Sequence, residues 1–496
     1  MEKEKVKQFL KENFWIILIL FFGFIIRIYY LILTKNQAEW WDSGEYASYA
    51  LHWAFGLPLE SINPQRPPLF PLLEAILFKL GFNEITFKFI LELIPSTLII
   101  LVSYLIVKEM YNKKLALIVA LFTSVFWLLI FNTVRLHADV LLILFSYLAV
   151  YYFWKGYIKK EKNYYIWLIG VFIALAFMTK LIAGLFGIIF LVYILIIDKF
   201  KFLKNKHLWI SLILMFLLLL PYFIWQINEF GKPTAFLAGS HVTSDPGGIT
   251  SYKPVGWYIL KHIPWMLNTT LLILMFIGIL TLYTLFLSLD LVIKNKNKES
   301  YNDLFIFIWI LITLIYFIFL ERDAEDRWLL PIMLPLLVIA GKGLIFVYDS
   351  IKKYEKKVAI SVFIILILVS FYFQIDRASE IINAKKDSYK EVKEASLWIK
   401  ENSKENDVIF SKSVTQMTYY SRRYVTGFGG NETEFKEKIK QYKPKYIVFS
   451  IFEPHGTTFE YTTKFSNSIV PVQAYFADNE KTKAVLIIYE FKNYDL

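Results

Sequence analysis

The chain has 496 residues, of which 57% are hydrophobic, 18% aromatic and 19% charged, and it carries a formal net charge of +12. A soluble domain usually holds about 25% charged residues, so this composition excludes a disordered chain, a fibrous protein and an ordinary soluble enzyme. Cysteine is absent, which excludes disulfides, thiolate metal sites and a cysteine nucleophile.

The apolar residues gather in long runs. A helix needs roughly 20 apolar residues to cross a bilayer core of about 30 Å. Eleven runs approach that length, at about 14–34, 85–107, 115–133, 138–154, 164–179, 181–197, 208–226, 264–290, 304–320, 328–348 and 358–373. The first run is too long for a signal peptide, so we expect an uncleaved span. The sequence predicts an α-helical polytopic membrane domain with about 11 transmembrane helices over residues 1–373.

Lysines predict the orientation of these helices. They cluster in alternate connections, at 3–11, 108–114, 155–162, 199–206, 294–298 and 352–357. Short loops rich in lysine stay in the cytoplasm, so we expect a cytoplasmic N-terminus. Much of the positive charge therefore reflects topology, and we expect membrane lipids as partners and no nucleic acid.

The other connections, 35–84, 134–137, 227–263 and 321–327, are then extracytoplasmic, as is the tail at 374–496. Alternating and amphipathic patterns in the tail predict helices over 387–402 and 432–442, and strands over 407–411, 445–451, 470–476 and 483–491. About 120 residues suffice for one small domain, so we expect an extracytoplasmic α/β domain after the membrane domain.

The first outer connection is rich in aromatic residues. Trp40, Trp41 and Tyr46 suggest a helix that lies in the membrane interface, with Asp42 near its start. Asp42 has two readings. It caps this helix, as Asp often does, or it is a carboxylate held at the edge of low dielectric for use in catalysis.

Further ionisable residues are predicted at the same membrane face. Arg135, His137 and Asp139 lie where the third and fourth runs meet, Lys180 separates two runs, and Arg327 closes the last outer loop. Charges at membrane depth usually pair with each other or belong to a site. A structural role suits each one alone, but together they bring cations and an acid from several loops to one face.

This combination of groups suits one type of chemistry. Arg and Lys can neutralise a lipid phosphate whose tail stays among the helices. A nearby carboxylate can act as general base toward an acceptor hydroxyl. An inverting glycosyl transfer requires little more than these two functions.

The order of these features resembles the polytopic GT-C glycosyltransferases, the group that includes dolichyl-phosphate-mannose protein mannosyltransferases and the aminoarabinose transferase of lipid A. The resemblance rests on WDSGEYASYA at 41–50, on RPPLFPLLEAILFKLGFNEITFKFILEL at 66–93 and on RLHAD at 135–139. Lys180 and the RWLLP segment at 327–331 fall where the family has comparable features. The stretch from about 40 to 155 matches best.

The resemblance implies a polyprenyl- or dolichyl-phosphate sugar as donor and a protein, glycan or lipid as acceptor. Asp42 is then the catalytic base. The family has Asp and Glu in succession, whereas Ser43 follows Asp42 here, so the role of Glu45 stays open. The other implied candidates are Glu45 and Asp139 as second acid, Arg135, Lys180 and Arg327 as donor-phosphate ligands, and Arg66, His137 and Tyr46 as acceptor or loop residues.

A metal site has little support in the sequence. His137 and Asp139 are two residues apart, and two ligands do not make a site. His241 and His262 stand alone in the 227–263 connection, whose turn at 245–248 belongs either to a lid over the donor or to an ordinary loop. We expect no obligatory metal or other cofactor.

Three further readings concern function. A transporter or flippase of lipid-linked sugars predicts internal repeats and broken helices, and we find no repeat. A membrane-anchored glycan-binding protein would use the aromatic and basic segment at 419–424. The segment at 40–44 also looks like the WWD-x-G signature of oligosaccharyltransferases, but theirs lies in a C-terminal domain, so we interpret the likeness as coincidence.

Overall fold

The computed structural model describes residues 2–238, 256–282, 298–321, 325–453, 456–477 and 480–494. The chain divides into two compact units. The helical unit comprises Met1–Leu33, Pro64–Leu69 and Lys88–Ile382, and the loop–tail unit comprises Thr34–Asn63, Phe70–Phe87 and Asn383–Leu496. Residues of the first outer connection thus belong mainly to the same unit as the tail.

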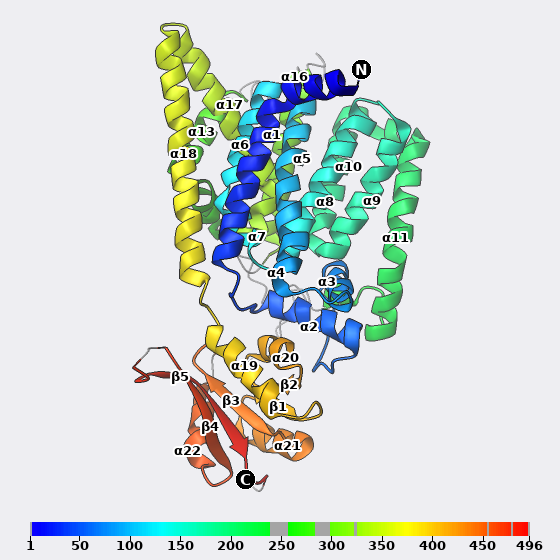
Figure 1. Cartoon of the computed structure of the whole chain (residues 1–496). Coiled ribbons are helices and arrows are strands. Elements are labelled where there is room, and N and C mark those ends of the chain that lie inside the picture. Colours follow the sequence, from blue (N-terminus) through cyan, green and yellow to red (C-terminus); the bar gives the residue numbers. More distant parts are fainter. Residues whose placement is uncertain are drawn as a thin grey trace. The chain divides into compact units, whose positions relative to one another are not determined.

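The helical unit is built from long helices that lie side by side (Figure 1). Its α-helices are α1 (Glu2–Leu33), α5 (Ile94–Met110), α6 (Lys113–Val125), α7 (Trp127–Thr133), α8 (Ala138–Phe153), α9 (Asn163–Thr179), α10 (Gly184–Asp198), α11 (Lys206–Phe230), α12 (Ala235–Ala238), α13 (His262–Leu280), α16 (Lys298–Phe319), α17 (Met333–Lys352) and α18 (Lys356–Lys385). Short π or 3-10 turns extend several of them, namely η1 (Lys88–Leu93), η2 (Trp154–Ile158), η3 (Leu181–Ala183), η4 (Lys199–Lys204), η6 (Gly256–Lys261) and η7 (Asp326–Ile332).

The described parts of the eleven predicted runs are largely helical. Nine helices among the described residues are long and apolar enough to cross a membrane. The run at 115–133 is a helix pair, α6 and α7, that bends by 51° at its break, and the run at 164–179 is the shorter apolar helix α9. The end of the run at 264–290 lies outside the described residues. The predicted polytopic helical fold is confirmed.

Two of the apolar spans are interrupted, and the side chain of Gln374 hydrogen-bonds to backbone groups at both interruptions. α6 and α7 part at Phe126, and α13 has a non-helical residue, Asn268, with φ of 63°. Gln374 of α18 accepts a hydrogen bond from the Trp127 amide at 2.8 Å and donates one to the Leu267 carbonyl at 2.9 Å. Backbone groups freed by a break in an apolar region need such partners.

The loop–tail unit holds α2 (Asp42–Phe55), α3 (Leu69–Lys79), α4 (Glu84–Phe87) and a five-stranded sheet. The sheet has the order β2-β1-β3-β5-β4, in which β1 pairs in parallel with β2 and β3, while β5 runs antiparallel to β3 and β4. Its strands are β1 (Val408–Ser411), β2 (Tyr424–Thr426), β3 (Tyr446–Ser450), β4 (Ile469–Phe476) and β5 (Ala484–Phe491). Its helices are α19 (Lys390–Asn402), α20 (Val414–Ser421), α21 (Glu432–Tyr442) and α22 (Tyr461–Lys464).

Helices cover both faces of this sheet. Val448 packs with residues of α19 and α20, whereas its neighbour Ile447 packs with residues of α21 and α22. Successive strand residues point to opposite faces, so β3, with all five residues buried, contributes to both cores. The predicted α/β tail is confirmed with its four predicted strands and two predicted helices; α20 and β2 were not expected.

Candidate functional site

Three of the predicted site residues meet in the helical unit. Asp139 lies in the first turn of α8 with its side chain 4% exposed. The ammonium of Lys180 binds its Oδ1 at 2.7 Å, and Nη1 of Arg327 lies 3.8 Å from its Oδ2. One buried carboxylate therefore joins two cations that are distant in the sequence.

Helix ends bring these side chains together. Lys180 adopts an extended conformation at the C-cap of α9, directly before η3, so its side chain stands at a break in the apolar helices. Arg327 lies in η7, before α17. The N-terminus of α8 favours a negative charge, which suits Asp139 in its first turn.

Two more predicted residues adjoin this network. The ring Nδ1 of His137 lies 3.2 Å from Nη1 of Arg327, and the His137 amide donates to Glu92 at 2.9 Å. Arg135 belongs to the same tight connection between α7 and α8, where its guanidinium stands 5.7 Å from the centre of the Phe131 ring.

The network is mixed in charge rather than a bare cationic pocket. Arg327 also donates to Glu325 through Nε at 2.5 Å. Lys carries three donors and Arg five, so each can hold a carboxylate and still donate to a phosphate. The partial burial of the network strengthens its electrostatic interactions.

Metal binding has no geometric support in the described part of the chain. No group of three or more His, Asp or Glu side chains there is arranged to hold a metal ion. His137 and Asp139 both contact the guanidinium of Arg327, and a neighbouring cation disfavours a metal ion.

Asp42 lies in the loop–tail unit, half-buried, as the first residue of α2. The N-cap residue is Trp41, whose side chain makes no capping hydrogen bond, and Asp42 follows it in the first turn of the helix. Trp41 has φ of 50° and is 55% exposed. A bulky residue in this backbone region stores strain, a feature that clusters at functional sites.

The other predicted residues of the first outer connection lie in two different units. Tyr49 donates to Glu45 at 2.7 Å and accepts from the Asn63 amide at 2.8 Å, which fixes the Glu45 carboxylate. Tyr46 is buried and packs edge-on against Phe70. Arg66 belongs to the helical unit, where it is half-buried in the turn before α3.

Sequence analysis missed several buried ionisable residues. Arg27 of α1 is fully buried and donates to Ser96 at 2.6 Å and to the Ser124 carbonyl at 2.9 Å. Glu92 is also fully buried. The signal was present, because a charge inside an otherwise apolar run marks an internal polar contact.

A second missed feature is a histidine–carboxylate pair. Nδ1 of His262 contacts Oδ1 of Asp326, the residue before Arg327. The ring Nε2 is buried and has no hydrogen-bond partner among the described residues. His241 and the predicted turn at 245–248 lie outside the described residues.

The loop–tail unit contains an isolated carboxyl group. Glu74 is fully buried, and neither of its oxygens has a hydrogen-bond partner in the described chain. Burial, together with the nearby carboxylates of Glu39 and Glu84, raises the pKa of Glu74 well above its usual value.

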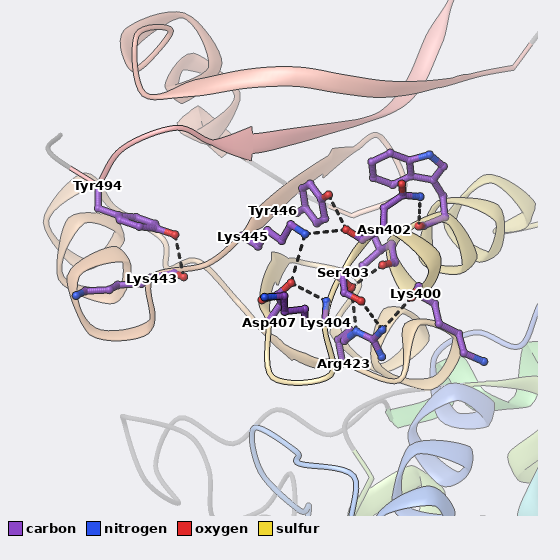
Figure 2. A network of polar contacts seen from close by, with 12 residues as sticks. Lys400, Asn402, Ser403, Lys404, Asp407, Arg423, Lys443, Lys445, Tyr446 and Tyr494 are labelled. Carbon is purple, nitrogen blue, oxygen red and sulfur yellow. Dashed lines mark hydrogen bonds and ion pairs between the residues drawn. The ribbon is translucent and has the colours of Figure 1, made fainter.

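Residues of the aromatic and basic segment at 419–424 form hydrogen bonds within the loop–tail unit. Tyr419 donates to Glu84 at 2.8 Å, and Tyr420 accepts from the Glu39 amide at 2.7 Å. Arg423 donates to the Lys400 and Ser403 carbonyls at the end of α19, each at 2.8 Å (Figure 2). These contacts disfavour glycan binding by Tyr419, Tyr420 and Arg423.

Comparison with known proteins gives one family and several similar folds. The family model of dolichyl-phosphate-mannose-protein mannosyltransferases matches residues 65–225. That range includes Arg66, Arg135, His137, Asp139 and Lys180. None of the curated protein sequences compared with the chain matches it.

The solved structures show the fold. ArnT from Cupriavidus metallidurans bound to undecaprenyl phosphate has a TM-score of 0.65 at 14% identity, covering 96% of this chain and 98% of that one. The oligosaccharyltransferase AglB from Archaeoglobus fulgidus, in complex with an inhibitory peptide and a dolichol-phosphate, has a TM-score of 0.64 at 13% identity, covering 98% and 75%. The predicted GT-C fold and the resemblance to GT-C enzymes are confirmed.

Proposed function

We propose that this chain is an integral membrane glycosyltransferase that moves a sugar from a polyprenyl- or dolichyl-phosphate donor to an acceptor hydroxyl. The family match and the GT-C fold support glycosyltransferase activity. The observation that carries the proposal is the partly buried network in which Asp139 binds Lys180 and approaches Arg327. Undecaprenyl phosphate and dolichol-phosphate, bound by the two similar structures, belong to the class of lipid phosphate that would leave in the proposed reaction.

The proposed reaction inverts the anomeric centre. Asp42 accepts the proton of the acceptor hydroxyl. The acceptor oxygen forms a bond to the anomeric carbon as the bond from that carbon to the phosphate oxygen breaks, and the lipid phosphate leaves with the electron pair. Arg135, Lys180 and Arg327 stabilise the charge of the departing phosphate.

Asp42→Asn tests the base. The amide cannot accept the proton, so we expect transfer to fall about 10²–10⁴-fold. The assay uses the purified full chain in lipid with a polyprenyl-phosphate sugar. Asp349→Asn is the matched control, because Asp349 belongs to an exposed ion pair with Lys114. Full activity of Asp42→Asn would contradict the assignment.

The cations are tested through donor binding. Lys180→Ala and Arg327→Ala should each raise the apparent KM for the donor by about tenfold, because each loses a charged hydrogen bond. Lys180→Ala also deprives Asp139 of its ammonium partner, so Lys180→Met with Asp139→Asn is measured beside it. Lys114→Ala serves as the control. An unchanged donor KM in all three site variants would remove these residues from the phosphate site.

The proposed orientation follows the lysine pattern. With a cytoplasmic N-terminus, the loop–tail unit and the donor site are extracytoplasmic. The acceptor is then a protein, glycan or lipid at that surface.

A further inference from the structure

The carboxyl ends of the parallel strands in the tail meet at one edge of the sheet. β1, β2 and β3 end at Ser411, Thr426 and Ser450, and α20 starts at Val414, with two residues between it and the end of β1. In open α/β sheets this edge is where ligands bind. In this chain another segment of the protein lies against that edge of the sheet.

Residues of the first outer connection occupy this edge. A Cβ atom on Gly44 would lie 3.3 Å from the Gln416 amide nitrogen and 3.4 Å from the Thr415 carbonyl carbon. Ser48 donates to the Thr415 carbonyl at 3.1 Å, and Thr426 donates to Glu60. The first turn of α2 thus packs directly on the first turn of α20.

The residues before Asp42 are held by the tail as well. Trp40 stacks on Tyr389, with ring centres 5.9 Å apart and planes 8° from parallel. The Glu39 amide donates to the hydroxyl of Tyr420. An apolar cluster joins the first outer connection, on both sides of Asp42, to the tail. Its buried residues are Ala38, Ala47, Leu51, Tyr419 and Tyr420.

We propose that the tail domain is a positioning element of the transfer reaction, which fixes Trp40–Gly44 against α20 and so orients the carboxylate of Asp42. This inference rests on the proposed function. Contacts on both sides of Asp42 hold Trp41 at its positive φ, a backbone conformation that persists in a bulky residue only where the surroundings impose it. Gly44 is a positioning residue, because a Cβ atom there would already lie against the backbone of α20 and a side chain larger than a methyl group would have to displace α2 from α20.

Gly44→Ala and Gly44→Val provide a graded test. Gly44→Val should lower kcat by about tenfold and Gly44→Ala by less, while the donor KM stays within twofold, because a small displacement of a base lowers the rate of the chemical step. Gly427→Ala is the control, since a Cβ atom there meets nothing within 4 Å. Wild-type kcat in Gly44→Val would overturn the proposal.

Tyr420→Phe tests the same positioning if Gly44→Val fails to fold. It retains the ring and removes the acceptor of the Glu39 amide, so kcat should fall several-fold with the donor KM unchanged. Wild-type kcat in Tyr420→Phe would contradict the proposal. A wild-type chain that transfers no sugar would instead refute the proposed function, so the two failures are distinguishable.

Discussion

Glu74 is a carboxylic acid in an environment that disfavours its charge. Its raised pKa means that the folded chain retains a proton that the unfolded chain loses as the pH rises above about 4.3. The free energy of unfolding of the loop–tail unit should therefore decrease as the pH rises from about 4.3 to the raised pKa of Glu74. This group contributes at most about 1.4 kcal/mol per pH unit to that decrease.

Glu74→Gln removes this dependence, because glutamine keeps the shape and cannot ionise. We expect the melting temperature of the variant to exceed that of the wild type by a margin that grows between pH 5 and pH 8. Glu437→Gln, at an exposed position of α21, should show no such trend. A margin that is constant or shrinks with pH would contradict the prediction. Other titrating groups cancel in the comparison.

His262 should act on donor binding through its neighbour Asp326. Removing the imidazole in His262→Ala leaves the Asp326 carboxylate without this partner, directly beside Arg327 in the chain. A carboxylate in that position competes with phosphate for the guanidinium, so we expect the donor KM to rise about fivefold, equivalent to about 1 kcal/mol.

The double variant His262→Ala with Asp326→Asn identifies the cause. It removes the competing charge as well, so the donor KM should return toward the wild-type value. If the donor KM of the double variant remains as high as that of His262→Ala, the effect of the histidine on donor binding does not depend on the Asp326 carboxylate. Thermal stability is measured for both variants, because the pair also connects α13 to η7.

At the scale of elements, Gln374 joins the two interrupted helices to α18. Gln374→Leu leaves the Trp127 amide and the Leu267 carbonyl without these hydrogen bonds in an apolar region. The expected cost is about 1–3 kcal/mol for each unsatisfied group, seen as a lower melting temperature in detergent. Ser370→Ala is the control on the same helix, because the Ser370 hydroxyl bonds only within α18 in the described structure. Equal melting temperatures for the two variants would contradict this role.

The interruptions also bear on the transporter reading. Broken helices are expected of transporters, whose freed backbone groups bind substrate or ions. Here Gln374 engages groups at both breaks, and Asn268 itself donates to the Phe373 carbonyl at 2.9 Å. These contacts give the breaks a structural role.

Long elements could be predicted from the sequence because their signal is local. Each apolar run contains its own evidence for a span, and α21 begins and ends at the predicted residues 432 and 442. α20 and β2 could not be predicted, because eight and three residues carry too little periodicity. Tyr419 and Tyr420 also looked like a glycan-binding surface, whereas their hydroxyls bond to the first outer connection.

The sequence indicated which charged residues to consider for the candidate site, but it did not indicate which of them contact one another. Asp139, Lys180 and Arg327 stand out because each is charged at the edge of an apolar run. Their ion pairs depend on how α8, α9 and η7 pack, which local patterns do not encode. The position of Gly44 against Gln416 joins residues far apart in the sequence, so only the fold reveals it.

At the scale of the whole molecule, the positive charge and the sugar-transfer chemistry are assigned to opposite membrane faces. The lysine-rich connections are expected in the cytoplasm, and the loop–tail unit outside. Because the chain has no cysteine, a single introduced cysteine reports its own side without background labelling. Lys204 in η4 and Lys440 in α21 are exposed positions, one for each expected side.

In intact cells, an impermeant maleimide should label Lys440→Cys and leave Lys204→Cys unmodified, because only the tail faces outward in the proposed orientation. Permeabilised cells should show labelling of both, which establishes that each thiol is reactive. Both variants should retain transfer activity, since neither residue belongs to the candidate site. Labelling of Lys204→Cys with protection of Lys440→Cys in intact cells would reverse the orientation, and would move Asp42 and its acceptor to the cytoplasmic face.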